Sequence, residues 1–165
     1  MLPLIDLHVH LEGSLLPEDV IELAKVGKVK LPAKTPVDLK KYLTAPLDCS
    51  SITDYYKFFD LSYAVTQTEE TIEKAMFMLL KRLSEKGVKY SEVRITPQYH
   101  LDKGLYQESV VMAALRGLEA AKSDFLINSN LILSFTRGIN NDQENLETLR
   151  IAAKYLHRGV CGVDL

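Results

Sequence analysis

The sequence predicts an α/β fold built on a parallel sheet, with helices between successive strands. Short apolar segments suited to strands occur at residues 5–9, 88–95, 130–136 and 160–165, and segments with helical periodicity separate them. Parallel strands need long crossovers, so this alternation favours a sheet covered by helices. Four such units fit a small open sheet or half of an eight-stranded (β/α)8 barrel, which takes about 250 residues. The chain finishes on a strand of buried type, and because an uncovered strand edge is unfavourable, we expect half of a barrel.

The composition is that of one ordinary globular domain of 165 residues, with 47% hydrophobic and 25% charged residues. Twenty basic and 22 acidic residues give a net charge of −2. That balance offers no electrostatic reason to expect a nucleic-acid or anionic-membrane partner. No apolar run is long enough for a membrane helix, and the N-terminus lacks the basic region of a secretion signal. We therefore expect a cytoplasmic protein.

The first third of the chain carries several helix start signals. The strand at 5–9 is expected to be short and buried, and the turn at 12–14 follows it. Pro17 suits the first position of a helix, and Thr35 precedes a second start. Ser50 or Ser51 begins a third helix that continues through Tyr56 and Phe59. These starts predict a helical segment at about 35–66.

The rest of the chain alternates long helices with strands. Thr66-Gln67-Thr68-Glu69 fits a capping box before a long helix, which Gly87 ends. Further helices are predicted at 107–121 and 143–157. The expected buried face of the first long helix consists of Ile72, Ala75, Met76, Leu79, Leu80 and Leu83.

A pair of histidines on the first strand carries the most chemical information. Side chains alternate along a strand, so His8 and His10 share one face while Leu7 and Val9 face the helix layer. Imidazole is a good zinc ligand, and catalytic zinc sites use about three protein ligands and a water. An HxH pair also occurs by chance as two ordinary histidines. Its position at the end of a strand, before an acid, a glycine and a helix start, favours the metal site.

The residues around this pair extend the argument beyond a single motif. Residues 4–15, LIDLHVHLEGSL, resemble the opening motif of the adenosine deaminase family, within the amidohydrolase superfamily. Residues 55–60, 90–97 and 159–165 resemble, in order, the family's helical lid, second strand and fourth strand, so the helical segment at about 35–66 is the expected lid. The resemblance covers the whole chain and corresponds to the N-terminal portion of a metal-dependent deaminase, so residues 1–165 would form half of a TIM barrel.

The resemblance implies a role for individual residues. The fold would carry one Zn²⁺, with His8 and His10 as two of its ligands and His10 also near the substrate. Glu12 would hold the ribose or an equivalent polar group, and Arg94 and Glu92 would form a structural charge network at the barrel end. The apolar wall over the ligand would consist of Ile52, Tyr55, Tyr56 and Phe59, although aromatic clusters of this kind are also ordinary helix core.

The implied reaction is hydrolysis of a cyclic amidine C–N bond, which converts adenosine into inosine and ammonia in purine nucleoside salvage. Zinc makes water nucleophilic near neutral pH, and a carboxylic acid protonates the ring nitrogen of the purine. The third zinc histidine, the general acid/base glutamate and a pair of aspartates are expected beyond Leu165. We therefore expect no catalytic general acid or base within the 165 residues, and no activity from this chain by itself.

One departure from the family pattern bears on the substrate. Adenosine deaminases usually have aspartate where this chain has Glu12, and glutamate there resembles relatives that act on adenine or other aminopurines. The extra methylene moves the carboxylate by about a bond length, which affects a contact to a ribose hydroxyl. The partner expected is thus a small purine nucleoside or base.

Three other functions compete with the deaminase. Metal-dependent phosphoesterases of the polymerase-and-histidinol-phosphatase type also begin with HxH, but the continuation at residues 11–14, LEGS, differs from theirs. Deaminases that act on nucleic acids combine H-x-E with P-C-x-x-C, and this combined signature is absent because the chain has no P-C-x-x-C. A third reading, of another class, is a non-catalytic half-barrel that self-associates through its open sheet edges.

The remaining candidates have structural interpretations. Cys49 and Cys161 form no CxxC pair, which argues against a disulfide framework, and Cys161 is expected to be a buried thiol. His157 is expected in the last turn of a helix. His100 is interpreted as a solvated loop histidine, with a place near the mouth of the active site as the alternative.

Overall fold

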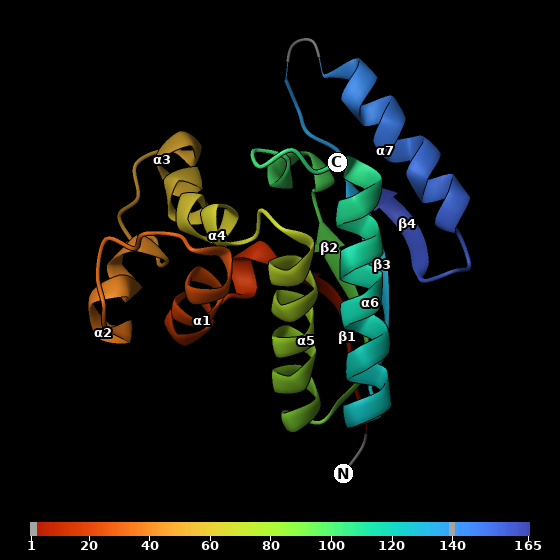
Figure 1. Ribbon diagram of the computed structural model, residues 1–165, viewed down its shortest axis with the longest axis horizontal. Helices are drawn as coiled ribbons and strands as arrows, with labels where there is room; N and C mark the ends of the chain where they lie inside the picture. Colours follow the sequence, from red (N-terminus) through yellow and green to blue (C-terminus); the bar gives the residue numbers. More distant parts are fainter. Residues whose placement is uncertain (1–2, 139–140) are drawn as a thin grey trace.

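The computed structural model describes residues 3–138 and 141–165, which form one four-stranded sheet with the order β1-β2-β3-β4 (Figure 1). All three strand pairings are parallel. Sequential order with right-handed crossovers places successive helices on the same face of a sheet, as in the wall of a barrel. A doubly wound sheet would instead reverse its strand order. The strands are β1 (Leu4–His10), β2 (Val88–Ile95), β3 (Asn128–Ser134) and β4 (Val160–Asp164).

The helices divide into a group beside the sheet and a group that covers it. In Figure 1, α1 to α4 gather on one side, whereas α5 and α6 lie along the strands. Short 3₁₀ turns follow the strands or join the small helices: η1 (Glu12–Ser14), η2 (Lys40–Tyr42), η3 (Lys57–Phe59) and η4 (Pro97–His100). The helices are α1 (Pro17–Gly27), α2 (Pro36–Leu39), α3 (Ile52–Tyr56), α4 (Asp60–Val65), α5 (Glu69–Glu85), α6 (Gln107–Phe125) and α7 (Asp142–Tyr155).

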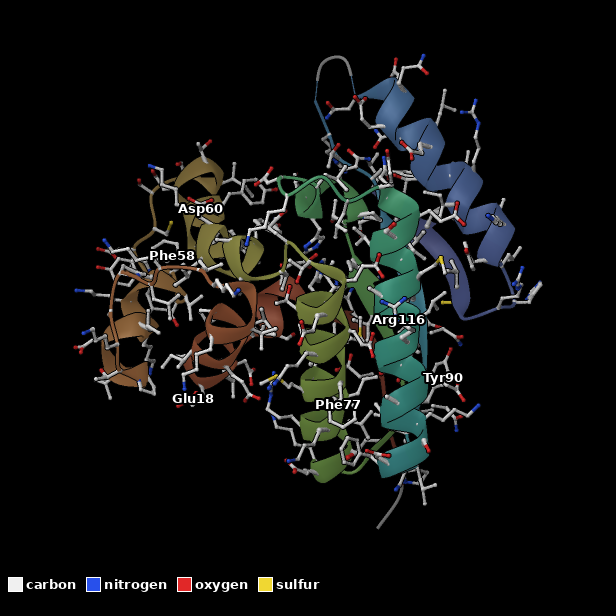
Figure 2. All side chains as sticks on the ribbon, viewed as in Figure 1. Glu18, Phe58, Asp60, Phe77, Tyr90 and Arg116 are labelled. Carbon is white, nitrogen blue, oxygen red and sulfur yellow. The ribbon has the colours of Figure 1, made fainter. Side chains whose placement is uncertain are left out.

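The core lies between the sheet and helices α5 and α6. Every residue predicted for the buried face of α5 is buried, because the helix turns that face toward β2 and α6. Outside this core, Arg116 on α6 donates to Glu73 (2.7 Å) and Glu69 (2.8 Å) on α5. Phe77 packs against Phe125 with ring centroids 5.0 Å apart, at the same helix pair (Figure 2). The α5–α6 pair is thus held by apolar contact inside and by ion pairs at its rim.

The capping box of α5 lies two residues later than predicted. Thr68 is the N-cap, and its hydroxyl accepts from the Thr71 N–H while the Thr71 hydroxyl accepts from the Thr68 N–H. Thr66 instead ends α4, where its hydroxyl donates to the Ser62 carbonyl (2.8 Å). The sequence allows both registers, and the end of α4 decides between them.

Several element ends also differ from the prediction. Helix α6 continues past 121 to Phe125, where Leu126 takes a left-handed conformation with φ 55°. Strand β3 covers 128–134 rather than 130–136. Helix α7 ends at Tyr155, so His157 lies beyond its last turn, with φ 60°. The expectation that His157 lies in the last turn of this helix was therefore wrong.

The two outer strands are more exposed than predicted. Leu7 does not enter the helix layer as expected and is 54% exposed, whereas Val9 packs against the core. Ile5 is 65% exposed, so the prediction of a buried first strand was wrong. Cys161 on β4 is exposed and not the buried thiol we expected. The common cause is position, because β1 and β4 each have one neighbouring strand. None of the described helices is long and apolar enough to span a membrane.

Gly117 on α6 allows the close approach of α5 and α6, and it provides a test of this packing. A Cβ at this position would lie 2.5 Å from the Glu73 carbonyl oxygen and 2.7 Å from the Met76 Cβ. We expect Gly117→Ala to lower the free energy of unfolding by about 1–3 kcal/mol, because overpacking forces the helices apart. Urea denaturation monitored by circular dichroism measures this change. Gly162→Ala, where a Cβ meets nothing within 4 Å, is the control; an equal loss in both variants would contradict the packing argument.

Candidate functional site

The structure brings the two histidines of β1 together on one face of the strand. The Nε2 atoms of His8 and His10 lie 3.3 Å apart. Two imidazole nitrogens bound to one tetrahedral zinc at 2.0–2.1 Å would be separated by about 3.3 Å. The β1–β2 register shifts between Asp6 and Val9, as at a β-bulge, and such irregularities re-aim side chains near sites. The predicted common face is confirmed, and the spacing suits a shared metal ion.

The surroundings of His10 favour its neutral form. Burial is the main cause that lowers the pKa of His10, and the neighbouring His8 lowers it further, while the charge of Glu12 opposes both. A neutral imidazole is the form that binds a metal ion. The backbone of His10 is also fixed, because the Ser14 hydroxyl donates to its carbonyl (2.6 Å).

A cavity of about 890 Å³ opens beside this pair, at the carboxyl ends of the strands. Catalytic sites of parallel barrels lie at this end. The lining includes the ends of all four strands or the residues just after them: His10, Thr96, Ser134 and Asp164. It is completed by His8, Val9, Gly13, Ser14, Tyr55, Tyr56, Phe59, Tyr63, Tyr99, Phe135, Thr136, Arg137 and Leu165.

One side of the cavity is an aromatic wall from the segment predicted as a lid. Tyr55 meets Phe59 edge-on with centroids 5.4 Å apart, and Phe59 stacks on Tyr63 at 6.2 Å. Tyr63 in turn packs against Tyr99 of η4 at 4.9 Å. Burial is the main cause that raises the pKa of Tyr63, so its phenol stays protonated. Ile52, also expected in this wall, lies outside the cavity lining and is 68% exposed.

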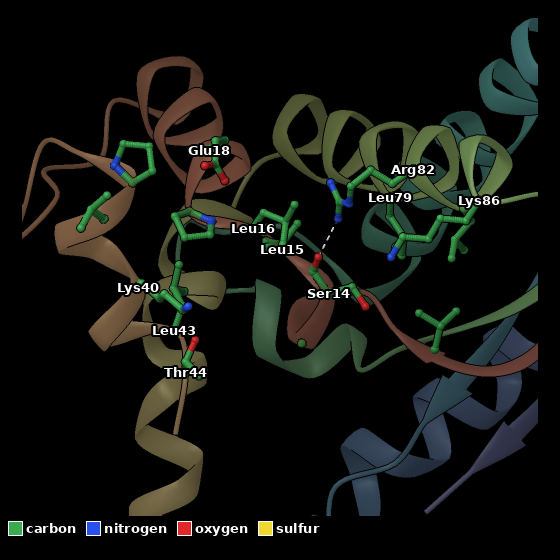
Figure 3. Close-up of a pocket in the computed structure, with 16 residues that line it drawn as sticks. Ser14, Leu15, Leu16, Glu18, Lys40, Leu43, Thr44, Leu79, Arg82 and Lys86 are labelled. Atoms are coloured by element: carbon green, nitrogen blue, oxygen red, sulfur yellow. Dashed lines mark hydrogen bonds between the residues drawn. The ribbon is translucent and has the colours of Figure 1, made fainter. Parts of the chain in front are cut away.

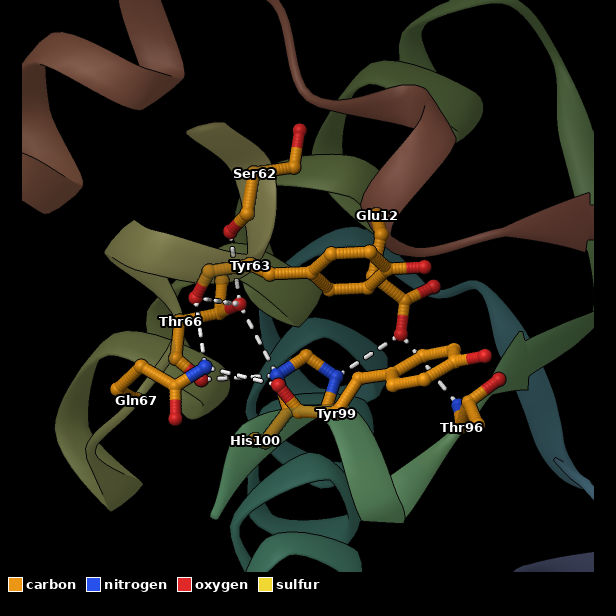
Figure 4. Close-up of polar contacts among 8 residues, drawn as sticks. All are labelled: Glu12, Ser62, Tyr63, Thr66, Gln67, Thr96, Tyr99 and His100. Carbon is orange, nitrogen blue, oxygen red and sulfur yellow. Dashed lines mark hydrogen bonds and ion pairs between the residues drawn. The ribbon is translucent and has the colours of Figure 1, made fainter. Parts of the chain in front are cut away.

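His100 is completely buried, so its interpretation as a solvated loop histidine was wrong. Its Nε2 lies 2.9 Å from Oε1 of Glu12, which is itself 5% exposed (Figure 4). The same carboxylate oxygen accepts weakly from the Thr96 N–H at 3.4 Å. Glu12 is therefore held inside the protein, near Tyr63 and Tyr99, and does not line the cavity. The sequence offered one clue to His100, namely that it follows a strand end in the second unit as Glu12 does in the first.

Arg94 joins three strands on the cavity side of the sheet. From β2 it donates through Nε to Asp164 of β4 (2.7 Å) and through a terminal nitrogen to the Leu7 carbonyl of β1 (2.9 Å). Hydrogen bonding to Arg94 is the main cause that lowers the pKa of Asp164. The expected charge network is thus present for Arg94, whereas Glu92 accepts from the Tyr90 hydroxyl (3.0 Å). Asp164 was not predicted, because its partner is 70 residues away in sequence.

A second hollow, of about 740 Å³, lies on the other side of β1, between α2 and α5 (Figure 3). Its most conspicuous charge is already paired, since Arg82 donates to the Ser14 carbonyl (2.6 Å) and to Asp19 (2.5 Å). The histidine pair faces the first cavity instead. Within the part of the chain that the structure describes, no cluster of three or more His, Cys, Asp or Glu side chains is placed to hold a metal ion. His8 and His10 would therefore be a partial ligand set.

Comparison with known proteins agrees with this arrangement. A family model described as adenosine deaminase matches residues 3–165. The adenosine deaminase of Haemophilus ducreyi is 44% identical over 165 residues, which cover 98% of this chain and 48% of that protein. The chain spans about half the length of the relatives that it matches.

Solved structures give the same picture of the fold. The adenine deaminase of Arthrobacter aurescens is 28% identical, with a TM-score of 0.76 over 98% of this chain and 47% of its own. An N6-mAMP deaminase from Arabidopsis is 28% identical, with a TM-score of 0.78 over 99% of this chain and 50% of its own. These neighbours are TIM barrels, so the predicted α/β half-barrel of about four strands is confirmed.

The histidine pair makes a specific prediction for metal binding. We expect the chain to bind Zn²⁺ weakly, and His8→Ala or His10→Ala to abolish that binding, because each removes one of the two nitrogens that face each other. Isothermal titration calorimetry with Zn²⁺ measures it. His157→Asn is the matched control, since His157 is exposed and its left-handed backbone suits asparagine. Equal binding by the control and by the His8 and His10 variants would exclude the pair as the zinc site.

Proposed function

Because the chain belongs to the adenosine deaminase family, we propose that its site takes part in zinc-dependent hydrolytic deamination of adenosine, which gives inosine and ammonia. The observation that carries this proposal is the His8–His10 pair, with Nε2 atoms 3.3 Å apart, at the edge of an aromatic-walled cavity. The family relation supports a hydrolase of the deaminase class, and the geometry supports a place for the metal and for a flat ring.

His8 and His10 would hold the metal. A bound zinc ion would supply a Lewis acid that makes water nucleophilic near neutral pH. The lowered pKa of His10 keeps its imidazole free of a proton and ready to act as a ligand.

The aromatic wall would bind the purine. Tyr55, Tyr56 and Phe59 present ring faces and edges to the cavity, which suits a planar heterocycle. Segment 35–66 would act as a lid that excludes water from the reacting carbon. The general acid/base carboxyl group is proposed to come from beyond Leu165, because Asp164 at the cavity is already paired with Arg94. That pairing keeps it ionised and unsuited to donate a proton.

A second substrate class is favoured by one observation. Glu12, the residue expected to hold a ribose hydroxyl, is buried against His100 and does not line the cavity. A site with no carboxylate free for the ribose fits adenine or another aminopurine base. The adenine deaminase and the N6-mAMP deaminase, each 28% identical, show that the fold is shared by enzymes with different aminopurine substrates.

An activity assay tests the proposal in two forms of the protein. The first is the 165-residue chain, and the second is a chimera that joins it to the C-terminal half of the Haemophilus ducreyi relative. We expect the chimera to release ammonia from adenosine or adenine, and the chain alone to be slower by roughly 10²- to 10⁴-fold, because it lacks the general acid/base.

The controls separate the parts of this proposal. Chelation of zinc should stop the chimera, and a ratio of rates on adenosine and adenine assigns the substrate. Turnover by the chain alone at the rate of the chimera would contradict the proposed division of the site. A folded chimera without activity on any aminopurine would contradict the deaminase function.

Self-association is a second function of another class, and the sheet edges favour it. Both outer strands have one neighbour, and β1 exposes Leu4 (50%) and Ile5 (65%). We propose that copies of the 165-residue chain pair through these edges, since unpaired strand edges recruit other strands. Multi-angle light scattering should show a dimer or larger species, and Ile5→Lys should shift it toward monomer. A cooperatively melting monomer at all concentrations would count against open-edge pairing.

A further inference from the structure

We propose that His100 is a positioning residue that fixes Glu12 and the base of the lid relative to each other. The lid here is segment 35–66, and its base is Thr66, where α4 ends. His100 belongs to η4, which follows β2, and Glu12 belongs to η1, which follows β1. One buried imidazole thus joins two strand ends and the lid. The effect on substrate binding rests on the proposed function, whereas the structural role does not.

The contacts of His100 leave no ring nitrogen unused. Nδ1 lies 2.8 Å from the Thr66 carbonyl oxygen, and a carbonyl can only accept, so Nδ1 carries a proton and donates it. Nε2, on the opposite side of the ring, lies 2.9 Å from Oε1 of Glu12. Whichever of those two atoms holds the proton, the contact joins a donor to an acceptor. The imidazole is therefore a rigid spacer with a fixed partner at each end.

Because these contacts are buried, the loss of either one leaves a polar group without a hydrogen-bond partner. The side chain of His100 is 0% exposed and that of Glu12 is 4% exposed, so water cannot replace a lost partner. The ring also meets Tyr63 edge-on with centroids 6.0 Å apart, and Tyr63 lines the cavity. A shift of His100 would therefore displace the Glu12 carboxylate, Tyr63 of the aromatic wall and the base of the lid together.

A neighbouring side chain offers a matched structural control. Gln67 also ties the lid base to η4, because its Nε2 donates to the Tyr99 carbonyl (2.8 Å) and its Oε1 accepts from the Asp102 N–H (2.9 Å). It makes no contact with Glu12. Gln67→Ala should loosen the lid without moving Glu12.

Two conservative variants separate the contact of His100 with Thr66 from its contact with Glu12. In His100→Asn the amide nitrogen takes the place of Nδ1, which keeps the bond to Thr66 and loses Glu12. In His100→Gln the amide nitrogen takes the place of Nε2, which keeps the bond to Glu12 and loses Thr66. A purely space-filling role predicts the same result for both.

The first readout needs no catalysis and uses the 165-residue chain. Trypsin cleaves exposed lid lysines such as Lys40, Lys41 and Lys57 at a rate that follows lid opening. We expect His100→Gln and Gln67→Ala to be cleaved about tenfold faster, which corresponds to about 1.4 kcal/mol. His100→Asn should be cleaved at nearly the unsubstituted rate. Equal rates for the Asn and Gln variants would overturn the proposal.

The second readout is the kinetics of the chimera described above. His100→Asn should change KM for the aminopurine by about tenfold or more with kcat nearly unchanged, because Glu12 loses its partner and Tyr63 of the aromatic wall loses its ring contact with His100. Gln67→Ala, which loosens the lid but leaves Glu12 and the His100 ring in place, should change KM clearly less than His100→Asn does. A KM change of the same size in Gln67→Ala would reduce His100 to a structural role. If the chimera is inactive, the proposed function fails while the trypsin comparison still decides on His100.

A third measurement covers the case in which both His100 variants fail to fold. In the NMR spectrum of the unsubstituted chain, the His100 Nδ1–H should exchange slowly with water and show contacts to Thr66. A rapidly exchanging His100 ring proton, like those of the exposed histidines His8 and His157, would overturn the proposal.

Discussion

The site depends on the parallel pairing of β1 with β2. Parallel strands end at the same edge of a sheet, so this pairing brings the residues after His10 next to those after Ile95. Glu12 can then reach His100 and the Thr96 N–H, contacts that span more than 80 residues of sequence. The register shift between Asp6 and Val9 leaves the Leu7 carbonyl to accept from Arg94.

Regular periodicity made the helices and inner strands predictable. Strand β2 matches its predicted limits, and the apolar face of α5 is buried throughout, because both are decided by neighbours within a few residues. The same reasoning failed where distant residues decide. Thr66 ends α4 and contacts His100, 34 residues away, so the cap of α5 falls to Thr68. Leu7 is exposed because β1 has a neighbouring strand on one side only.

The candidate site was predictable in its histidine pair and not in its buried polar part. Two histidines on alternate positions of a strand share a face in any sheet, so His8 and His10 could be paired from sequence. His100 could not be placed in this way. It lies in an irregular turn, and its partners Glu12 and Thr66 lie 88 and 34 residues away. Tyr63, Tyr99 and Asp164 enter the cavity through similar long-range packing.

The bridge made by Arg94 also governs the shape of the sheet. Its guanidinium reaches from β2 to β1 on one side and to β4 on the other, passing over β3. This bridge limits how far the strands can move apart. The bridge restrains the spacing of the strands independently of the residues outside the sheet that line the cavity. Lining residues outside the sheet, such as Tyr55 and Tyr99, can therefore vary and reshape the walls of the cavity while the framework of strands stays constant.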